Sequence, residues 1–105
     1  MVGKVIELNA ESFDDFVSEG ERVIDFWAAW CAPCKILSPI VEELAGEMKK
    51  VKFGKVDVDK YGELAQRFQI LSIPTLLYFK DGEQVNRTSG AIPKEELKKE
   101  IDGSF

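Results

Sequence analysis

Two cysteines separated by two residues are the most chemically informative feature of the sequence. The motif is Cys31-Ala32-Pro33-Cys34, and the chain contains no other cysteine. It follows the apolar stretch Arg22–Ala28 and precedes a segment with helical periodicity. A cysteine at a helix start lies near unpaired N–H groups and the positive end of the helix dipole, which favour the thiolate. A spacing of three on a helix also lets two cysteines form a disulfide after small adjustments. The motif therefore predicts thiol-disulfide exchange.

The two cysteines are expected to have different roles. Cys31, on the exposed side, attacks a substrate disulfide, and the more buried Cys34 resolves the mixed disulfide by attacking the Cys31 sulfur. Pro33 suits the first turn of a helix, because it has no N–H to lose and its φ is fixed. The alternatives are an inert pair or a pair of metal ligands. A closed zinc site would need ligands from a second chain, since the sequence has no histidine.

A carboxylate interrupts the apolar stretch ahead of the motif. Asp25 lies in Val23-Ile24-Asp25-Phe26-Trp27, and burial there would raise its pKa and keep it neutral or paired. A group tuned in this way can accept the proton of Cys34. The alternative is an aspartate that faces solvent or caps a loop. Lys55 reaches Asp25 if their strands are neighbours, and is otherwise a solvated lysine extending from the sheet.

A proline precedes the next apolar segment. In Ser72-Ile73-Pro74-Thr75 the residues alone favour a trans Ile73–Pro74 bond, which is the commoner form. A cis bond beside the cysteines would instead present the backbone of Ile73 to an extended substrate by strand addition.

Two further positions are candidates for substrate contact. Trp30 adjoins Cys31 and is expected to be partly exposed, where it shields the sulfur and meets substrates. Gly90, before Ala91, allows close backbone approach; the alternative is an ordinary loop glycine.

The elements that must position these residues follow from hydrophobic periodicity and turn signals. Their order predicts an α/β domain over residues 1–105, with a mixed sheet covered on both faces. The early crossovers are expected to be parallel and right-handed, and the closing hairpin at Asp81-Gly82 antiparallel. The predicted strands are Val5–Leu8, Arg22–Ala28, Val51–Val58, Thr75–Lys80 and Glu83–Thr88. Four helices are predicted. The first begins after Ser12, the second covers 34–49, the third covers Tyr61–Phe68, and the last begins at Pro93.

Charge and composition exclude several classes of protein. The 14 basic and 19 acidic residues give a net charge of −5, which argues against nucleic acid or an anionic membrane as the main partner. The apolar runs are far shorter than the ~20 residues of a spanning helix. The first residues, MVGKVIELNA, have no signal-peptide pattern. We therefore expect a cytoplasmic location, where a C-x-x-C motif is more often catalytic or metal-binding than structural.

The sequence resembles the thioredoxin family over essentially its whole length. This resemblance implies the thioredoxin fold, with a five-stranded mixed sheet and four helices. It also implies reduction of protein disulfides by a monomer without a bound cofactor, re-reduced from NADPH by a flavoprotein thioredoxin reductase. The matching segments are Trp27–Lys35, Pro39, Lys55-Val56-Asp57, Ile73-Pro74-Thr75, Lys80-Asp81-Gly82 and Gly90-Ala91.

The resemblance implies a role for each candidate residue. Cys31 matches the nucleophile, Cys34 the resolving thiol, Asp25 the buried carboxylate and Lys55 its lysine neighbour. Pro74 matches a cis proline, and this replaces the trans expectation. The residues expected to line the apolar substrate groove with it are Trp30, Ala32, Pro33, Ile73, Gly90 and Ala91.

One position departs from the family pattern. Ala32 stands where thioredoxins usually have glycine, and it adds a methyl group and stiffness beside the nucleophile. The substitution bears on reduction potential and client range.

Two other functions remain open for this chain: a reductant dedicated to one client, and a binding module without turnover. The intact cysteines and Asp25 argue against the binding module.

Overall fold

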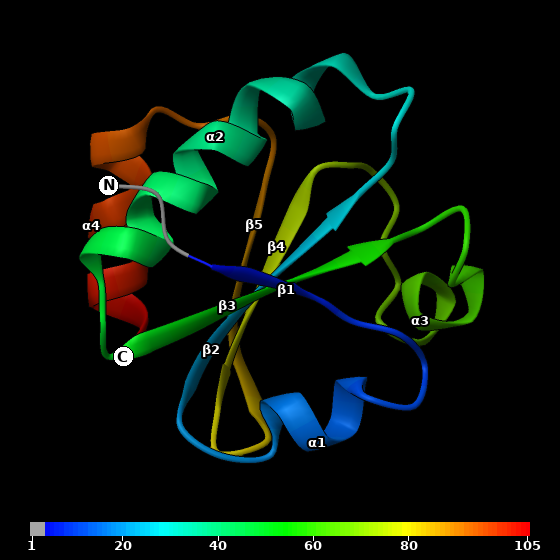
Figure 1. The fold of residues 1–105 in the computed structure, drawn as a ribbon, viewed down its shortest axis with the longest axis horizontal. Helices are drawn as coiled ribbons and strands as arrows, with labels where there is room; N and C mark the ends of the chain where they lie inside the picture. The colour runs from blue at the N-terminus through cyan, green and yellow to red at the C-terminus, as the bar shows by residue number, and fades with distance from the viewer. Residues whose placement is uncertain (1–3) are drawn as a thin grey trace.

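Residues 4–105, which the computed structural model describes, form five strands and four helices (Figure 1). In chain order these are β1 (Val5–Glu7), α1 (Phe13–Val17), β2 (Glu21–Trp27), α2 (Ala32–Glu47), β3 (Val51–Asp57), α3 (Gly62–Arg67), β4 (Thr75–Lys80), β5 (Glu83–Ser89) and α4 (Lys94–Ser104). Every predicted element is present, and most boundaries differ by one or two residues. None of the helices in this described part of the chain is long and apolar enough to cross a membrane.

The strands form one mixed sheet in the order β1-β3-β2-β4-β5. Strand β3 pairs in parallel with both β1 and β2, whereas β4 pairs antiparallel with β2 and with β5. The Asp81-Gly82 turn has φ of 49° and 88°, the positive values that a two-residue hairpin requires. The predicted mixed sheet and its antiparallel closing hairpin are confirmed.

Two of the helix starts differ from the sequence prediction, and a third helix begins as predicted but without a side-chain cap. Helix α2 begins at Ala32 rather than at residue 34, because the Cys31 sulfur accepts the Cys34 N–H and caps the helix earlier. Pro93 is the N-cap of α4 rather than its first residue. Ser12 occupies the N-cap position of α1 but makes no side-chain cap; its hydroxyl accepts the N–H of Asn9 instead.

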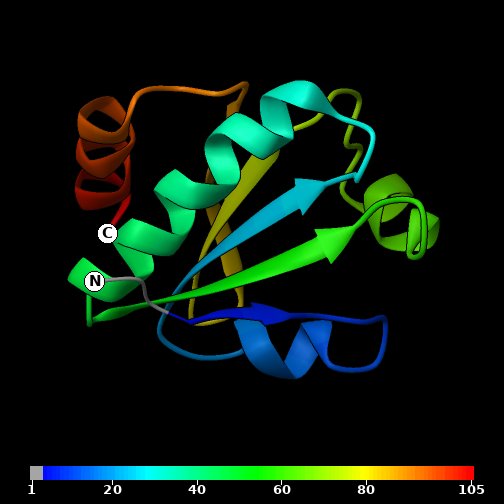
Figure 2. The same cartoon turned by 45° about the horizontal axis from the view of Figure 1, so that its top comes forward.

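Helices cover both faces of the sheet, α2 and α4 on one face and α1 and α3 on the other (Figure 2). Each pair seals its own apolar core. The core beneath α2 and α4 contains Val23, Leu37, Val41, Leu44, Val51, Phe53, Leu76, Tyr78, Leu97 and Ile101. The core beneath α1 and α3 contains Leu8, Phe13, Val17, Ile24, Phe26, Val56, Leu64, Leu77 and Phe79.

The alternation of β2 determines where its carboxylate lies. Val23 belongs to the core under α2, whereas Ile24 and Phe26 belong to the opposite core. Since successive side chains of a strand point to opposite faces, Asp25 shares the face of Val23. That face is the one covered by α2, the helix that carries Cys34.

Candidate active site

Cys31 and Cys34 form a disulfide at the N-terminus of α2, with their Cα atoms 5.3 Å apart. Cys31 is the N-cap residue, with extended backbone, and its Sγ lies 3.3 Å from the Cys34 N–H nitrogen that donates to it. Pro33 lies in the first turn, as predicted. The nucleophile expected from sequence therefore sits at the positive end of a helix of 16 residues, where an anionic sulfur is stabilised.

The two cysteines are almost equally buried, contrary to the sequence prediction. Cys31 is only 4% exposed and Cys34 3%, so the prediction that Cys31 lies on the exposed side is wrong. Both belong to a small apolar cluster with Ala28, against which Val58 and Ile73 pack. These covering residues come from segments distant in sequence, and Cys31 is reached through the pocket that it lines.

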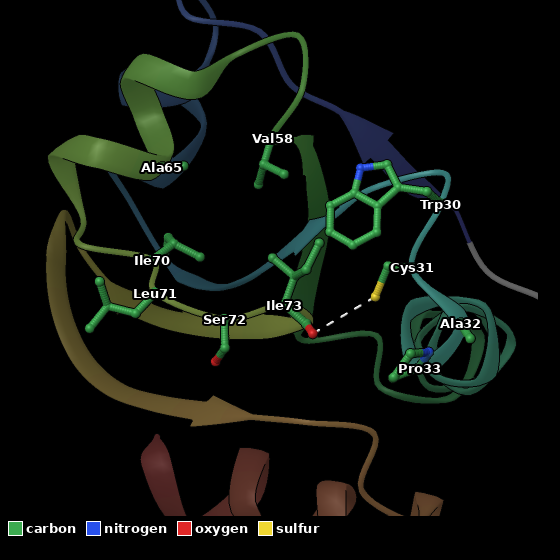
Figure 3. A pocket seen from close by; sticks show the side chains of 10 residues that line it. All are labelled: Trp30, Cys31, Ala32, Pro33, Val58, Ala65, Ile70, Leu71, Ser72 and Ile73. Atoms are coloured by element: carbon green, nitrogen blue, oxygen red, sulfur yellow. Dashed lines mark hydrogen bonds between the residues drawn. The ribbon is translucent and has the colours of Figure 1, made fainter.

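A pocket of about 530 Å³ opens beside Cys31 (Figure 3). Within it, the Cys31 Sγ lies 3.8 Å from the carbonyl oxygen of Ile73. Four predicted groove residues, Trp30, Ala32, Pro33 and Ile73, line this pocket. Sequence reasoning missed the remaining lining residues, which are Val58, Ala65, Ile70, Leu71 and Ser72.

The other predicted groove residues lie outside that pocket lining. The Ile73–Pro74 bond is cis, as the family resemblance implies and contrary to the expectation from residue frequencies. Gly90 donates its N–H to the Pro74 carbonyl at 2.9 Å. A Cβ on Gly90 would meet no atom within 4 Å, whereas its φ is +90°; backbone conformation, not close approach within this chain, accounts for the glycine. Ala91 follows it on the exposed surface.

Trp30 is 69% exposed, as predicted, and its ring is held by a hydrogen bond. The indole Nε1–H donates to Asp59 Oδ2 at 3.0 Å. The loop is itself ordered locally, because the Asp59 N–H donates to Asp57 Oδ1 at 2.9 Å. Asp59 is a further residue that sequence reasoning missed; its only sequence signal is an acidic turn following β3.

A second cavity, of about 280 Å³, is lined by Cys34, whereas the first is lined by Cys31. Burial raises the pKa of Asp25 to about 7, and the charge of Lys55 opposes part of this rise. The predicted burial of Asp25 is thus confirmed, at 4% exposure. The cavity is lined by Asp25, Trp27, Ala28, Ala29, Cys34, Lys35, Ser38 and Lys55.

Lys55 is the register partner of Asp25 on the adjacent parallel strand. Its Nζ lies 5.4 Å from the centroid of the Trp27 ring, within the range of a cation–π contact. Asp25 Oδ1 and Trp27 Nε1 are buried without a hydrogen-bond partner among residues 4–105. Buried polar groups are ordinarily hydrogen-bonded, and both of these residues line the second cavity.

These features combine a cysteine pair at a helix N-terminus with a buried carboxyl group. The carboxyl group has a pKa of about 7, so near neutral pH it can both take up and release a proton. Within residues 4–105 there is no group of three or more His, Cys, Asp or Glu side chains that could hold a metal ion. The arrangement supplies dithiol chemistry.

Comparison with known proteins identifies relatives over nearly the whole chain. The family profile described as Thioredoxin matches residues 4–103. Thioredoxin of Staphylococcus saprophyticus is 43% identical over 99 residues, covering 93% of this chain and 95% of that protein. Thioredoxin of Staphylococcus aureus is 40% identical with the same coverage. The crystal structure of Malassezia sympodialis thioredoxin aligns with a TM-score of 0.86 at 36% identity, over 98% of this chain and 93% of that one.

The fold, the cysteine pair and the relatives lead to one assignment. Thioredoxins are thiol-disulfide oxidoreductases that work through a redox-active disulfide, and the Cys31–Cys34 pair has the spacing and bond of such a disulfide. The chain belongs to the thioredoxin family and is a thiol-disulfide oxidoreductase.

Proposed function

We propose that this chain is a general reductant of protein disulfides, re-reduced from NADPH through a separate flavoprotein thioredoxin reductase. The observation that carries the proposal is the position of the cysteine pair. Cys31 caps α2 and lines an open pocket, whereas Cys34 lines the cavity that contains Asp25. One sulfur is thus placed to meet a client, and the other to meet a proton acceptor.

The first step joins the reduced protein to its client. The Cys31 thiolate attacks one sulfur of the client disulfide, an S–S bond forms between the two proteins, and the other client sulfur leaves as a thiolate. The helix N-terminus and the Cys34 N–H, which lies 3.3 Å from the Cys31 sulfur, favour the attacking thiolate. The departing client thiolate takes its proton from water.

The second step releases the client. The Cys34 thiol gives its proton to the Asp25 carboxylate, directly or through water in their shared cavity. The Cys34 sulfur then attacks Cys31, the intramolecular disulfide forms, and the client sulfur leaves as a thiolate. In total the client gains two electrons and the protein becomes the disulfide form.

The other predicted residues position these reactants. Lys55 adjusts the proton affinity of Asp25 through its charge. The carbonyl of Ile73 marks the edge along which an extended client segment would lie, with Pro74 directly after it. Trp30, Ala32 and Pro33 form the motif side of the pocket, while Gly90 and Ala91 provide further exposed surface for clients.

Partners and setting follow from the same reasoning. The net charge of −5 disfavours nucleic acid and anionic membranes as partners. We expect residues 1–105 to act as a single-domain monomer in the cytoplasm, with disulfide-containing proteins and thioredoxin reductase as partners.

Trapping with serine variants tests the proposal. Cys34→Ser retains the nucleophile but lacks the resolving thiol, so it should accumulate a mixed disulfide with a disulfide-bonded client protein, visible on non-reducing gels and by mass spectrometry. The matched variant Cys31→Ser should trap none and catalyse no reduction. Equal trapping by both variants, or catalytic reduction by Cys31→Ser, would overturn the assignment of roles.

A further inference from the structure

Arg87 connects the edge strand β5 to the far end of α3. Its register partner on β4 is Leu77, which belongs to the core beneath α1 and α3. Directly paired residues of neighbouring strands share one face of a sheet, so Arg87 lies on the α3 face. There its guanidinium donates to two successive backbone carbonyls, those of Phe68 and Gln69. The Nη1 atom lies 3.0 Å from the Gln69 oxygen.

The two carbonyls belong to the peptide units on either side of Gln69. Each unit is planar, so the only free rotations between them are φ and ψ of Gln69. A guanidinium is a rigid planar fork of donors, and by bonding both oxygens it holds the two units in one relative orientation. Gln69 has φ of 53°, a left-handed conformation that is costly for a residue other than glycine. Arg87 therefore clamps the turn through which the chain leaves α3.

The segment after this turn leads to the reactive sulfur. Its last residue, Ile73, places its carbonyl oxygen 3.8 Å from the Cys31 Sγ (Figure 3). The N–H groups of Leu71, Ser72 and Ile73 donate no hydrogen bond to another group within residues 4–105. The hydrogen bonds that set the position of the Ile73 carbonyl are therefore those at the two ends of the segment.

Strand β5 and its neighbour hold the downstream end. The Thr75 hydroxyl donates to the Ser72 carbonyl at 2.6 Å and lies 3.2 Å from the Ser89 hydroxyl. The Gly90 N–H donates to the Pro74 carbonyl at 2.9 Å. At the upstream end, the side-chain hydrogen bonds found among the described residues are those of the arginine clamp. The clamp thus has no substitute in the part of the chain that the structure describes.

A client that binds as an extended strand depends on this arrangement. Its backbone would pair with the segment through hydrogen bonds, which weaken steeply when the distance or angle departs from the best values. A misplacement of about 1 Å, caused by a mutation far from the chemistry, can cost on the order of 100-fold in rate. A small disulfide without a peptide backbone makes no such pairing and meets only the Cys31 sulfur.

We infer that Arg87 is a positioning residue that clamps the Gln69 turn and so sets the Ile73 carbonyl in register with Cys31 for extended clients. The inference rests on the proposed disulfide reduction. It adds that β5, through this arginine, favours peptide disulfides over small disulfides that do not use the backbone of the segment.

A ratio of rate constants tests the inference. One substrate is the symmetric disulfide dimer of a short, end-blocked, alanine-based peptide with one central cysteine, and the other is 2-hydroxyethyl disulfide. Each is mixed with the fully reduced protein, and the second-order rate constant for the peptide is divided by that for the small disulfide. In Arg87→Ala this ratio should fall about tenfold, which is less than the loss caused by a full 1 Å displacement because the downstream contacts remain.

Two further variants separate positioning from stability and from charge. The control Arg22→Ala removes another arginine that donates to two carbonyls, those of Phe16 and Glu21, at the end of β2 away from the cysteines. It should keep the wild-type ratio. Arg87→Lys keeps the positive charge but lacks the fork, so its ratio should stay closer to that of Arg87→Ala than to that of the wild type. Urea unfolding verifies that each variant is folded under the conditions of the rate measurement.

A backbone-modified peptide tests whether the clamp acts through strand pairing. The same peptide is prepared with one N-methyl group on the residue before or after its cysteine, which removes one backbone donor. In one of the two positions, methylation should slow the wild type about tenfold, the worth of one hydrogen bond. It should slow Arg87→Ala much less, because the pairing is already weakened there.

The outcomes distinguish the clamp from the reaction itself. An unchanged ratio in Arg87→Ala, an equal fall in Arg22→Ala, a full ratio in Arg87→Lys, or equal slowing of wild type and Arg87→Ala by methylation would overturn the positioning role while disulfide reduction stands. Failure of the wild type to reduce both 2-hydroxyethyl disulfide and the peptide would instead overturn the proposed function.

Discussion

Asp25 and Lys55 are directly paired in register on the adjacent parallel strands β2 and β3. Both line the cavity that contains Cys34. Burial raises the pKa of Asp25 to about 7 and the lysine charge limits that rise. The pair thus holds a carboxyl group that can exchange a proton near neutral pH, beside the thiol that must lose one.

Replacing the carboxylate should separate the two steps of exchange. In Asp25→Asn, Cys34 has no anionic proton acceptor, so resolution of the mixed disulfide should slow by about 100-fold or more at pH 7, in line with the usual 10²- to 10⁴-fold worth of a general base. Formation of the mixed disulfide by Cys31 should change much less. Stopped-flow fluorescence with a disulfide-bonded client resolves the two phases. Equal slowing of both phases would contradict the proton-acceptor role.

Asp25 should also make the stability of the oxidised protein depend on pH. Its pKa is 3.8 in the unfolded chain and about 7 in the folded one, so between these values the folded state binds more protons. The contribution of Asp25 to the free energy of unfolding is therefore fully present below pH 4. It is lost as the pH rises to about 7, which lowers the free energy of unfolding by a few kcal/mol, at roughly 1.4 kcal/mol per pKa unit. Urea unfolding of Asp25→Asn should lack this fall, leaving the variant more stable than the wild type at pH 8.

The matched control for that measurement is Asp102→Asn, which changes an exposed carboxylate on α4. This variant should keep the wild-type fall. If Asp25→Asn and the wild type lose stability in parallel between pH 4 and 7, Asp25 does not carry the linkage.

Removing the charge of Lys55 should raise the pKa of the proton acceptor, Asp25. In Lys55→Met, the Asp25 pKa should rise further above 7, because the charge that opposes the effect of burial is gone. The pH midpoint of mixed-disulfide resolution should move upward and the rate at pH 7 should fall. The control is Lys52→Met, which changes an exposed lysine on the same strand. It should leave the pH midpoint of mixed-disulfide resolution unchanged. A midpoint that stays fixed or moves down in Lys55→Met would show that the lysine does not tune Asp25.

Leu8 and Phe16 pack so closely against strand β3 that only glycine fits at position 54. A Cβ at Gly54 on β3 would lie 2.8 Å from Leu8 Cδ1 and 3.1 Å from Phe16 Cε2. Gly54→Ala should therefore lower the free energy of unfolding by about 1–3 kcal/mol. Gly103→Ala, in α4 with no atom within 4 Å of the added Cβ, should be neutral or stabilising by up to about 1 kcal/mol. Equal effects of both variants in urea unfolding would contradict this packing.

At the buried end of the site, the sequence pattern alone predicted the elements but left the pairing of Asp25 with Lys55 open. Apolar residues on both sides of Asp25 indicated a central strand, and the motif that follows β2 placed Cys34 on the covering helix. These two inferences depend on local pattern and on the connection rules of α/β sheets. That Lys55 lies beside Asp25 came only from the family resemblance, because the order of the strands in the sheet was not predicted from the residues.

The client side of the site could not be predicted in the same way. The loop before Pro74 is fixed by Arg87 of β5, whose guanidinium donates to the carbonyls of Phe68 and Gln69. Nothing in the local sequence signals that contact. For the same reason the burial of Cys31 was mispredicted, because Val58 and Ile73, which pack against its cluster, reach it only through the tertiary fold.

The reduction potential of the Cys31–Cys34 pair tests the central claim most directly. The protein would be equilibrated in graded dithiol and disulfide buffers, quenched by alkylation, and its alkylated thiols counted by mass spectrometry. The account predicts a potential below, or in the lower part of, the cytosolic glutathione range of roughly −220 to −320 mV. A potential well above that range would mean that Ala32 and its surroundings make the protein an oxidant or isomerase, and would contradict its assignment as a reductant.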